Sequence, residues 1–492
     1  MSVFAVEIFL VLLGVGLLCL EALLPSVTRR AIAALSLGGT ALALVLFAFA
    51  DTSAAALPAF VQPFHQLDSL ALFYKGFALV ATLAVLWLTV ENRGYLERHC
   101  PEGRHGEMFS LPPLVCAGMM WMASAKDLMT VFVCLELVTV SFYVLVAFAR
   151  KSSLVLEAGV KYLILGALST GVLVYGIAWT YGVTDSMSFD GISAALADPE
   201  TPRRGALLGA AFLLAGLGFK VAAAPFHIWV PDVYQGAPLP VTTFLSVGSK
   251  AAGFVVLSRV VAAFTAAESL IRTEITTLLL IAGAATILLG SLPALFQTSV
   301  KRLLAYSSIS HAGYLLLALA AAPTARHDLS SAGVTAFYLG TYLPMTVLGF
   351  LVLSVLRQNG VGDDLRDLAG LGRRQPFLAL AATLGFASLA GLPLTAGFMG
   401  KLLVFLGLVD HAAWAALTCA VIGAAAGFYY YLRPVLAMYS GSPATAEPIK
   451  LSTATRAVLF ALVAAIIVIG VYPRSLQAPL KSAGTTAVHA SH

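Results

Sequence analysis

Residues 218–254 read GFKVAAAPFHIWVPDVYQGAPLPVTTFLSVGSKAAGF, a stretch that combines apolar segments with charge and helix breakers. Its flanks are apolar enough to lie in a lipid bilayer, yet it contains Lys220, Lys250, His227 and four prolines. Proline removes a backbone donor and opens a helix, and lipid tolerates such a break only where protein or water satisfies the freed groups. The stretch therefore predicts a broken membrane helix beside buried charge.

The rest of the chain is a series of apolar segments of spanning length. Of its 492 residues, 60% are hydrophobic and 11% are charged, whereas about 25% charged residues is usual for a soluble domain. We predict an all-α polytopic membrane protein with about 14 transmembrane helices. The predicted spans cover residues 3–24, 30–50, 69–90, 107–124, 128–149, 156–181, 205–224, 239–262, 275–296, 302–321, 331–356, 376–405, 412–436 and 454–473.

The basic residues predict the orientation of these spans. With the N-terminus outside, sixteen Lys and Arg residues fall in inside loops and seven in outside loops and tails. Because cytoplasmic loops are enriched in Lys and Arg, we expect both termini on the outer (periplasmic) side of a bacterial inner membrane. The longest loop, residues 184–204, is too short for a separate soluble domain.

A second interrupted segment, residues 387–405, reads ASLAGLPLTAGFMGKLLVF. Pro225 and Pro393 mark breaks in the seventh and twelfth predicted helices, and paired broken helices indicate a transport site between inverted repeats. Lys220 and Lys401 are 181 residues apart, an interval of five spans, so we expect two inverted five-helix repeats. The expected organisation is an N-terminal three-helix segment (1–106), a first repeat of helices 4–8 (107–262), a second repeat of helices 9–13 (263–436), and helix 14 with a tail (437–492).

Few ionisable side chains lie well inside the predicted spans. They are Glu136, Lys161, Lys220, Lys250, His311 and Lys401, with His227 at the first break. Each charge at mid-membrane costs roughly 2.5–3.5 kcal/mol on insertion scales. A lysine in low-dielectric surroundings can exchange a proton near neutral pH. The pattern therefore predicts proton transfer through the membrane.

Several of these residues also have a structural interpretation. Lys161 follows Glu157 by four residues, the spacing of an intrahelical ion pair. His311 has hydroxyl neighbours in the sequence and is compatible with a hydrogen-bonded core histidine. Lys75 lies near a span end, where we expect its ammonium to reach the membrane surface, and Glu7 is expected only to flank the first span.

The sequence gives little support for a metal site or a nucleotide-binding site. The five cysteines are scattered without metal-ligand or redox spacing, so no metal site is predicted. The segment GFMGK, which ends at Lys401, lacks the spacing and the Ser or Thr of a phosphate-binding loop. Glu136, Lys220, Lys250 and Lys401 have no oppositely charged residue four positions away, so pairs within one helix do not explain them. A purely structural role for all four together is disfavoured, while one or two of them could be partners in a static buried pair.

Four motifs resemble the antiporter-like proton-pumping subunits of respiratory complex I, and most of all subunit N of bacterial NADH–quinone oxidoreductase. They read KVAAAPFHIWVPDVYQGAPLPVTTFLSVGSKAAGF, KRLLAYSSISHAGYLLLAL, EAGVKYLILGALSTGVLVYG and LAGLPLTAGFMGKLLVF. The resemblance is strong from about residue 124 to 405 and weaker elsewhere. It implies fourteen helices with two inverted repeats, and a glutamate–lysine pair whose opening and closing governs proton release.

The motifs imply positions for the family's functional residues. These are the fifth-helix glutamate at Glu136 in LEL, the seventh-helix lysine at Lys220, the eighth-helix lysine at Lys250, the twelfth-helix lysine at Lys401, and further polar positions at Lys161 and His311. Some sister subunits have glutamate at the twelfth-helix position, so a lysine there is more similar to subunit N.

The resemblance implies a subunit without a redox centre of its own. NADH, flavin, iron–sulfur clusters and quinone are expected in partner subunits, and other complex I membrane subunits and the lipid bilayer are the expected partners, with no nucleic acid. Protons would pass from the cytoplasmic side along Glu136, Lys220, Lys250, His311 and Lys401. The alternatives are a subunit of a multisubunit cation/proton antiporter or of a membrane-bound hydrogenase, with Na⁺ in place of H⁺ left open, and a non-conducting structural spacer.

Overall fold

The computed structural model describes residues 2–23, 29–100, 106–321, 329–441 and 449–481. Within these ranges the chain forms α-helices, short 3-10 and π turns and isolated bridges, and no extended strand. The all-α prediction is confirmed. The chain forms two compact units, of which the first comprises Met1–Val90, His99–Trp229 and Gly236–Leu279, and the second comprises Glu91–Arg98, Val230–Gln235 and Leu280–His492.

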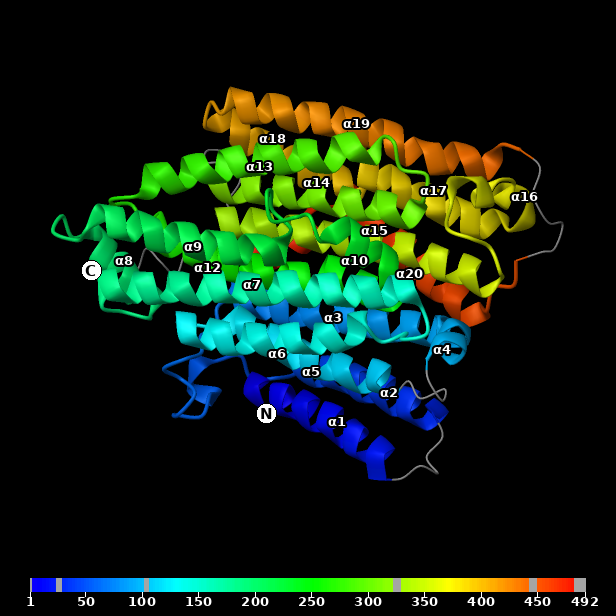
Figure 1. The fold of residues 1–492 in the computed structure, drawn as a ribbon, viewed down its shortest axis with the longest axis horizontal. Coiled ribbons are helices and arrows are strands. Elements are labelled where there is room, and N and C mark those ends of the chain that lie inside the picture. Colours follow the sequence, from blue (N-terminus) through cyan, green and yellow to red (C-terminus); the bar gives the residue numbers. More distant parts are fainter. Residues whose placement is uncertain (1, 24–28, 101–105, 322–328, 442–448, 482–492) are drawn as a thin grey trace. The chain divides into compact units, whose positions relative to one another are not determined.

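The first unit is a bundle of long helices (Figure 1). Its elements are α1 (Val3–Leu23), α2 (Arg29–Ala48), η1 (Ala54–Ala56), α3 (Ser69–Glu91, whose last residue belongs to the second unit), α5 (Glu107–Ser124), α6 (Leu128–Val146), α7 (Ser153–Thr184), α8 (Phe189–Ala197), α9 (Arg203–Val221), α11 (Leu239–Phe244), η3 (Leu245–Ser249) and α12 (Lys250–Phe264). The helix α5 packs against α1, α6 and α12, while α9 packs against α7 and α12. These contacts bring α6, α9 and α12 into one neighbourhood.

The second unit is built around α15 (Ser331–Gln358), which is buried along most of its length. Its other elements are α4 (Arg93–His99), α10 (Val230–Gly236), most of α13 (Arg272–Ala294), α14 (Val300–Ala320), η4 (Leu365–Leu368), α16 (Leu371–Arg374), α17 (Pro376–Ala390), α18 (Ala396–Asp410), α19 (Trp414–Tyr439), α20 (Thr453–Val471) and α21 (Arg474–Lys481). The helix α15 contacts α14, α17, α18 and α20, and α19 packs on α17.

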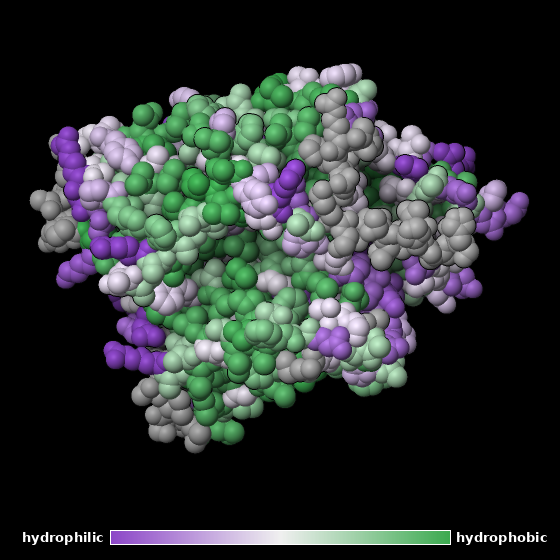
Figure 2. Space-filling model, turned by 180° about the vertical axis from the view of Figure 1, so that it is seen from behind, coloured by the Kyte–Doolittle hydropathy of each residue, from purple (hydrophilic) through white to green (hydrophobic). Residues whose placement is uncertain are grey.

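Every predicted span corresponds to a helix or to a pair of helices. Twelve helices among the described residues are long and apolar enough to cross a membrane by themselves. The other two predicted spans are α5, which contains Pro112 and Pro113, and the broken pair α17–α18, whose halves have 15 residues each. Figure 2 shows that hydrophobic side chains make up most of the visible surface.

The break in the seventh span begins where α9 ends at Val221. Ala222 adopts a left-handed conformation with φ 63°, and the Ala223 N–H donates to the Gly218 carbonyl at 2.8 Å, which closes the helix end. Residues 222–229 are non-helical before α10 begins. The Trp229 indole donates to the Phe219 carbonyl at 3.1 Å, so the protein itself satisfies a backbone group at the break.

The break in the twelfth span uses the same type of helix end. Gly391 has φ +90°, and the Leu392 N–H donates to the Ala387 carbonyl at 3.0 Å. Where the chain re-enters a helix, the Gly397 N–H donates to the Ser388 hydroxyl at 3.1 Å. Both predicted breaks are therefore present, the first around Pro225 in the seventh span and the second around Pro393 in the twelfth.

Candidate functional site

Lys220 lies in the last turn of α9, directly before the first break, and its side chain is 9% exposed. Its ammonium donates to the hydroxyl of Thr139 on α6 at 2.5 Å. Glu136 lies three residues before Thr139, and its carboxylate accepts from the Thr170 hydroxyl at 2.8 Å. Glu136 and Lys220 thus face one neighbourhood without an ion pair, each held by a threonine.

Lys250 begins α12 and is 1% exposed. It directly follows the π turn η3, and such turns widen a helix locally and occur often at functional positions. Gly253 lies one turn further along the same face of α12, where a Cβ atom would be 3.5 Å from the Lys220 Cβ. The face of α12 that carries Lys250 therefore packs against the turn of α9 that carries Lys220.

His311 lies in the middle of α14 and is buried among aromatic residues of the second unit. Its Nδ1 is 2.7 Å from the Tyr338 hydroxyl on α15, and its Nε2 is 3.2 Å from the Tyr431 hydroxyl on α19. The Tyr431 hydroxyl also hydrogen-bonds the Ser307 hydroxyl. Because both ring nitrogens face hydroxyl groups, the imidazole can accept a proton on one side and release one on the other.

Lys401 lies in α18, beyond the second break, and is 5% exposed. Its ammonium reaches back across the break and donates to the carbonyls of Leu389 at 3.0 Å and Ala390 at 2.9 Å. Pro393 has no N–H, so it cannot donate to the Leu389 carbonyl four residues earlier. The lysine thus supplies the donors that the break removes, at the negative end of the α17 dipole.

An aromatic pair connects the surroundings of Lys401 and His311. The Lys401 ammonium is 5.5 Å from the centre of the Tyr314 ring. Tyr314 stacks on Tyr338 with ring centres 6.3 Å apart, and Tyr338 is a hydrogen-bond partner of His311. The second unit therefore contains a continuous set of a lysine, two tyrosines and a histidine.

Two of the predicted site residues, Lys161 and His227, are more exposed than the buried lysines and His311. Lys161 is 40% exposed on α7 and forms an ion pair with Glu157 at 2.7 Å, which is the structural interpretation that its spacing offered. His227 lies in the first break and is partly buried. Its Nδ1 is buried and has no hydrogen-bond partner among the described residues.

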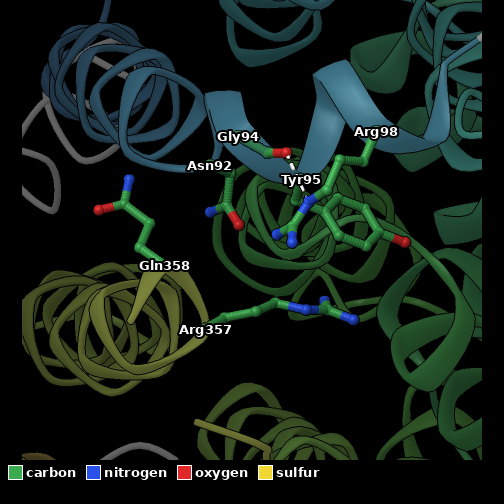
Figure 3. A pocket seen from close by; sticks show the side chains of 6 residues that line it. All are labelled: Asn92, Gly94, Tyr95, Arg98, Arg357 and Gln358. Carbon is green, nitrogen blue, oxygen red and sulfur yellow. Dashed lines mark hydrogen bonds between the residues drawn. The ribbon is translucent and has the colours of Figure 1, made fainter. Parts of the chain in front are cut away.

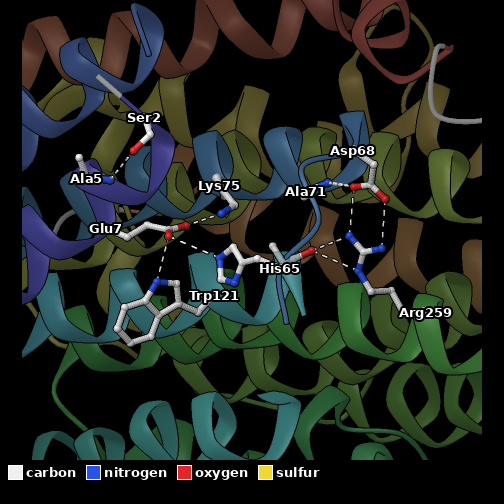
Figure 4. A network of polar contacts seen from close by, with 10 residues as sticks. Ser2, Ala5, Glu7, His65, Asp68, Ala71, Lys75, Trp121 and Arg259 are labelled. Carbon is white, nitrogen blue, oxygen red and sulfur yellow. Dashed lines mark hydrogen bonds and ion pairs between the residues drawn. The ribbon is translucent and has the colours of Figure 1, made fainter. Parts of the chain in front are cut away.

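The sequence prediction missed a buried polar network in the first unit (Figure 4). Glu7 and Lys75 are both fully buried and form an ion pair, so the expectations that Glu7 flanks its span and that Lys75 reaches the surface are wrong. The Glu7 carboxylate also accepts from the Trp121 indole at 2.9 Å, and His65 Nε2 lies 3.5 Å from it. This network joins α1, α3 and α5.

A second pair in the same region fixes the end of α12. The Arg259 guanidinium donates to both carboxylate oxygens of Asp68 at 3.0 and 3.1 Å, and also to the Ala123 carbonyl (Figure 4). Such a two-pronged arrangement is the stronger form of an arginine–carboxylate pair. The pair with Asp68 explains how Arg259 can be buried without a part in proton transfer.

The donor sets do not suit a bound metal. Among the described residues, no three His, Cys, Asp or Glu side chains come close enough to hold an ion. The arrangement instead places titratable nitrogen and carboxylate groups beside hydroxyls and helix breaks. Such groups can pass protons over short distances when water enters a break.

Comparison with known proteins identifies the family. The family model described as "NADH:quinone oxidoreductase/Mrp antiporter, TM" matches residues 125–427. NADH-quinone oxidoreductase subunit N of Trichlorobacter lovleyi is 41% identical, over 89% of this chain and 87% of its own length. Subunit N of Desulforamulus reducens is 36% identical, over 96% of this chain and 95% of its own.

Solved structures agree with this assignment. A chain of respiratory complex I from Thermus thermophilus with bound aureothin has 33% identity and a TM-score of 0.79, covering 97% of this chain and 100% of that chain. A chain of the Mrp complex from Dietzia shares the fold, with a TM-score of 0.80 at 19% identity, covering 98% of this chain and 96% of that chain. With the matched region containing both helix breaks and their lysines, this chain belongs to the NADH:quinone oxidoreductase/Mrp antiporter membrane-protein family.

Proposed function

We propose that this chain is a proton-translocating membrane subunit of NADH–quinone oxidoreductase, and that it acts as part of that enzyme without a redox centre of its own. The observation that carries the proposal is the burial of lysines at helix breaks in both units. Lys220 and Lys401 each lie within one or two turns of a break, and each is nearly inaccessible. Lys401 also completes the backbone of its break, whereas Lys220 contributes little to its helix end, so a chain that served only as a spacer would gain little from the charge of Lys220.

In the first unit, Glu136, Lys220 and Lys250 would carry the proton. The Lys220 ammonium is bonded to Thr139 and the Glu136 carboxylate to Thr170, an arrangement that we interpret as an open Glu136–Lys220 pair. Closing the pair would require Lys220 to leave Thr139, and this movement would change how strongly its proton is held. Lys250, on the packed face of α12, would receive the proton next.

In the second unit, His311 and Lys401 would carry the proton. The hydroxyls of Tyr338 and Tyr431 lie on the two sides of the imidazole, and they support a relay through its two nitrogens. Lys161 and His227 would be accessory groups, because one is half-exposed and the other lies in a break. Pro225 and Pro393 would serve by keeping the breaks open to water.

The redox cofactors of the enzyme would lie in partner subunits. We expect NADH, flavin, iron–sulfur clusters and quinone there, with the driving energy passed to this chain through neighbouring membrane subunits. Moving one charge against 100 mV requires about 2.3 kcal/mol. The excess of Lys and Arg in alternate loops supports a bacterial inner-membrane location with both termini on the periplasmic side.

The test uses the whole enzyme reconstituted into liposomes, with Lys220→Met as the variant. Quinone reduction and proton uptake, followed by a pH-sensitive dye, are measured together. We expect the ratio of protons moved to quinone reduced to fall, with the enzyme still assembled. Lys450→Met, at an exposed loop lysine, is the matched control and should keep the full ratio.

Two results would contradict the proposal. One is an unchanged ratio of protons to quinone in the Lys220→Met enzyme. The other is co-purification of the chain in mild detergent with ion-exchange subunits and without any quinone-reducing module. That second result, together with Na⁺-dependent proton exchange, would favour the cation/proton antiporter alternative, whose fold this chain shares.

A further inference from the structure

The second unit contains a polar cavity whose lining includes neither His311 nor Lys401. It has a volume of about 260 Å³ and is lined by Asn92, Gly94, Tyr95, Arg98, Arg357 and Gln358. Figure 3 shows that its lining comes from α4 and the residues just before it on one side, and from the end of α15 on the other. The volume is slightly below the usual range for ligand pockets, about 300–1,000 Å³, so it suits a headgroup better than a large molecule.

The cavity is lined by two arginines and by no carboxylate. Arg98 makes one hydrogen bond, from Nε to the Gly94 carbonyl at 3.0 Å. The Arg357 guanidinium lies 4.2 Å from the centre of the Tyr95 ring, a stacking that leaves its N–H edge available. Neither arginine forms an ion pair among the described residues.

The neighbouring charges add to this positive character. Arg93 lies on the same helix as Arg98, and its Nε is buried without a hydrogen-bond partner among the described residues. Lys301 lies within electrostatic range of Arg357 and of Asp363. Of the acidic groups on this side, Glu91 accepts a hydrogen bond from Thr455.

The remaining acidic group on α4, Glu97, is exposed and does not line the cavity. It precedes Arg98 by one residue, and adjacent residues on a helix point in different directions. The lining of the cavity therefore contains two arginines and no carboxylate, with Arg93 and Lys301 as further basic residues nearby and Asp363 as the acidic residue beside Lys301.

The cavity lies at the ends of two candidate membrane spans, the level at which lipid headgroups are expected. The candidate spans α3 and α15 end at Glu91 and Gln358, and the lining residues begin within one residue of these ends. In the orientation proposed from the distribution of Lys and Arg, this side of the chain faces the cytoplasm. Anionic lipids are enriched in the cytoplasmic leaflet, and basic pockets beside membrane helices bind their headgroups.

We infer that this cavity binds the phosphate of an anionic phospholipid, with Arg98 and Arg357 as its two ligands. Guanidinium groups contact phosphate oxygens through paired N–H donors. A lipid is favoured over a free anion because the cavity opens where headgroups are concentrated. The inference is independent of the proposed proton route, since none of the lining residues belongs to it.

The test is native mass spectrometry of the purified complex, delipidated in mild detergent and titrated with phosphatidylglycerol or phosphatidylcholine. We expect at least a tenfold preference for phosphatidylglycerol in the wild type. Arg98→Gln with Arg357→Gln should abolish this preference, and Arg98→Gln alone, at an exposed position, should reduce it without disturbing the fold. Arg456→Gln, an exposed arginine at the start of α20, is the matched control and should keep the preference.

Three outcomes would overturn the inference. The first is equal phosphatidylglycerol binding by the wild type and the double variant. The second is displacement of the lipid by millimolar inorganic phosphate, which would make the site one for a free anion. The third is loss of a neighbouring membrane subunit from the double variant while the lipid is retained, which would assign the arginines to a protein contact.

Discussion

The two broken helices end in the same way and use their lysines differently. In each, a left-handed residue closes the first half-helix, Ala222 with φ 63° and Gly391 with φ 90°. In the first break the buried lysine precedes this residue by two positions, whereas in the second it follows by ten. The two lysines therefore lie on opposite sides of otherwise similar helix ends.

This difference determines what each lysine holds. The Lys401 ammonium donates to two main-chain carbonyls that the break leaves without helical partners. The Lys220 ammonium donates to one side-chain hydroxyl, Thr139, on another helix. A main-chain partner is fixed by the fold, while a side-chain partner can be exchanged by a rotamer change.

Burial of a lysine at a helix break therefore has two separable uses. Lys401 completes the backbone of its break and is therefore part of the structure as well as of the proposed route. Lys220 contributes little to the helix end, which is closed by backbone bonds and by Trp229. We accordingly expect the two lysines to differ most in their effect on stability.

Lys401→Met should therefore destabilise the protein more than Lys220→Met. The substitution removes two charge-assisted hydrogen bonds to buried carbonyls, each worth about 1.5–3 kcal/mol, so a loss of about 3 kcal/mol or more is expected. Lys220→Met should change stability little, because Thr139 keeps its hydrogen bond to the Leu135 carbonyl. The measurement is retention of this subunit in the complex on heating.

Equal melting temperatures of the Lys401→Met and Lys220→Met variants would show that the two lysines do not differ in their effect on stability. Such a result would mean that water satisfies the Leu389 and Ala390 carbonyls as well as Lys401 does. Lys401→Arg serves as the control, since it keeps a donor and a charge at the same position. It should recover part of the stability that Lys401→Met loses.

A smaller effect is expected at the left-handed residues. Gly391→Ala places a side chain in a conformation that costs about 1–2 kcal/mol, and its Cβ would lie 3.1 Å from Lys401 Cδ. The converse change, Ala222→Gly, removes the same strain from the first break. We expect the melting temperature to fall in the first variant and to hold or rise in the second.

A fall of similar size in both variants would contradict this expectation. It would indicate that flexibility at the helix ends, rather than left-handed strain, controls their stability. Gly360, a left-handed glycine with open space around it, offers the control for strain alone. Gly360→Ala should lower the melting temperature through left-handed strain alone, because its new Cβ atom would meet no neighbouring side chain.

The helices and their breaks could be predicted from the sequence because their signals are local. Apolar length, the prolines at 225 and 393, and the glycines around the second break each act within a few residues. The same local reasoning treated Lys220 and Lys401 as equivalent, because counting spans does not say on which side of a break a residue lies. Their distances to Pro225 and Pro393 in the sequence contained that information.

The partners of the buried groups could not be predicted in this way. Thr139 and Tyr431 lie on helices distant in sequence from the groups they contact. Tyr338 lies on the helix after that of His311, but hydroxyl residues are common in membrane helices and nothing in the sequence singles it out. The Glu7–Lys75 pair did leave a signal. Both residues lie near the starts of spans predicted to run in the same direction, so opposite charges occur at one depth in two helices.

The smallest expected effect concerns the exchangeable partner of Lys220. Thr139→Val keeps the shape of the side chain and removes the hydroxyl, so Lys220 loses one charge-assisted hydrogen bond, worth about 1.5 kcal/mol at the low end of the range for such bonds, or about tenfold in the equilibrium between bonded and released Lys220. We expect the ratio of protons to quinone to fall partially, and Thr139→Ser to restore it. If both variants lose the same amount, packing of α6 rather than the hydroxyl is responsible, and the distinction between the two lysines rests on Lys401 alone.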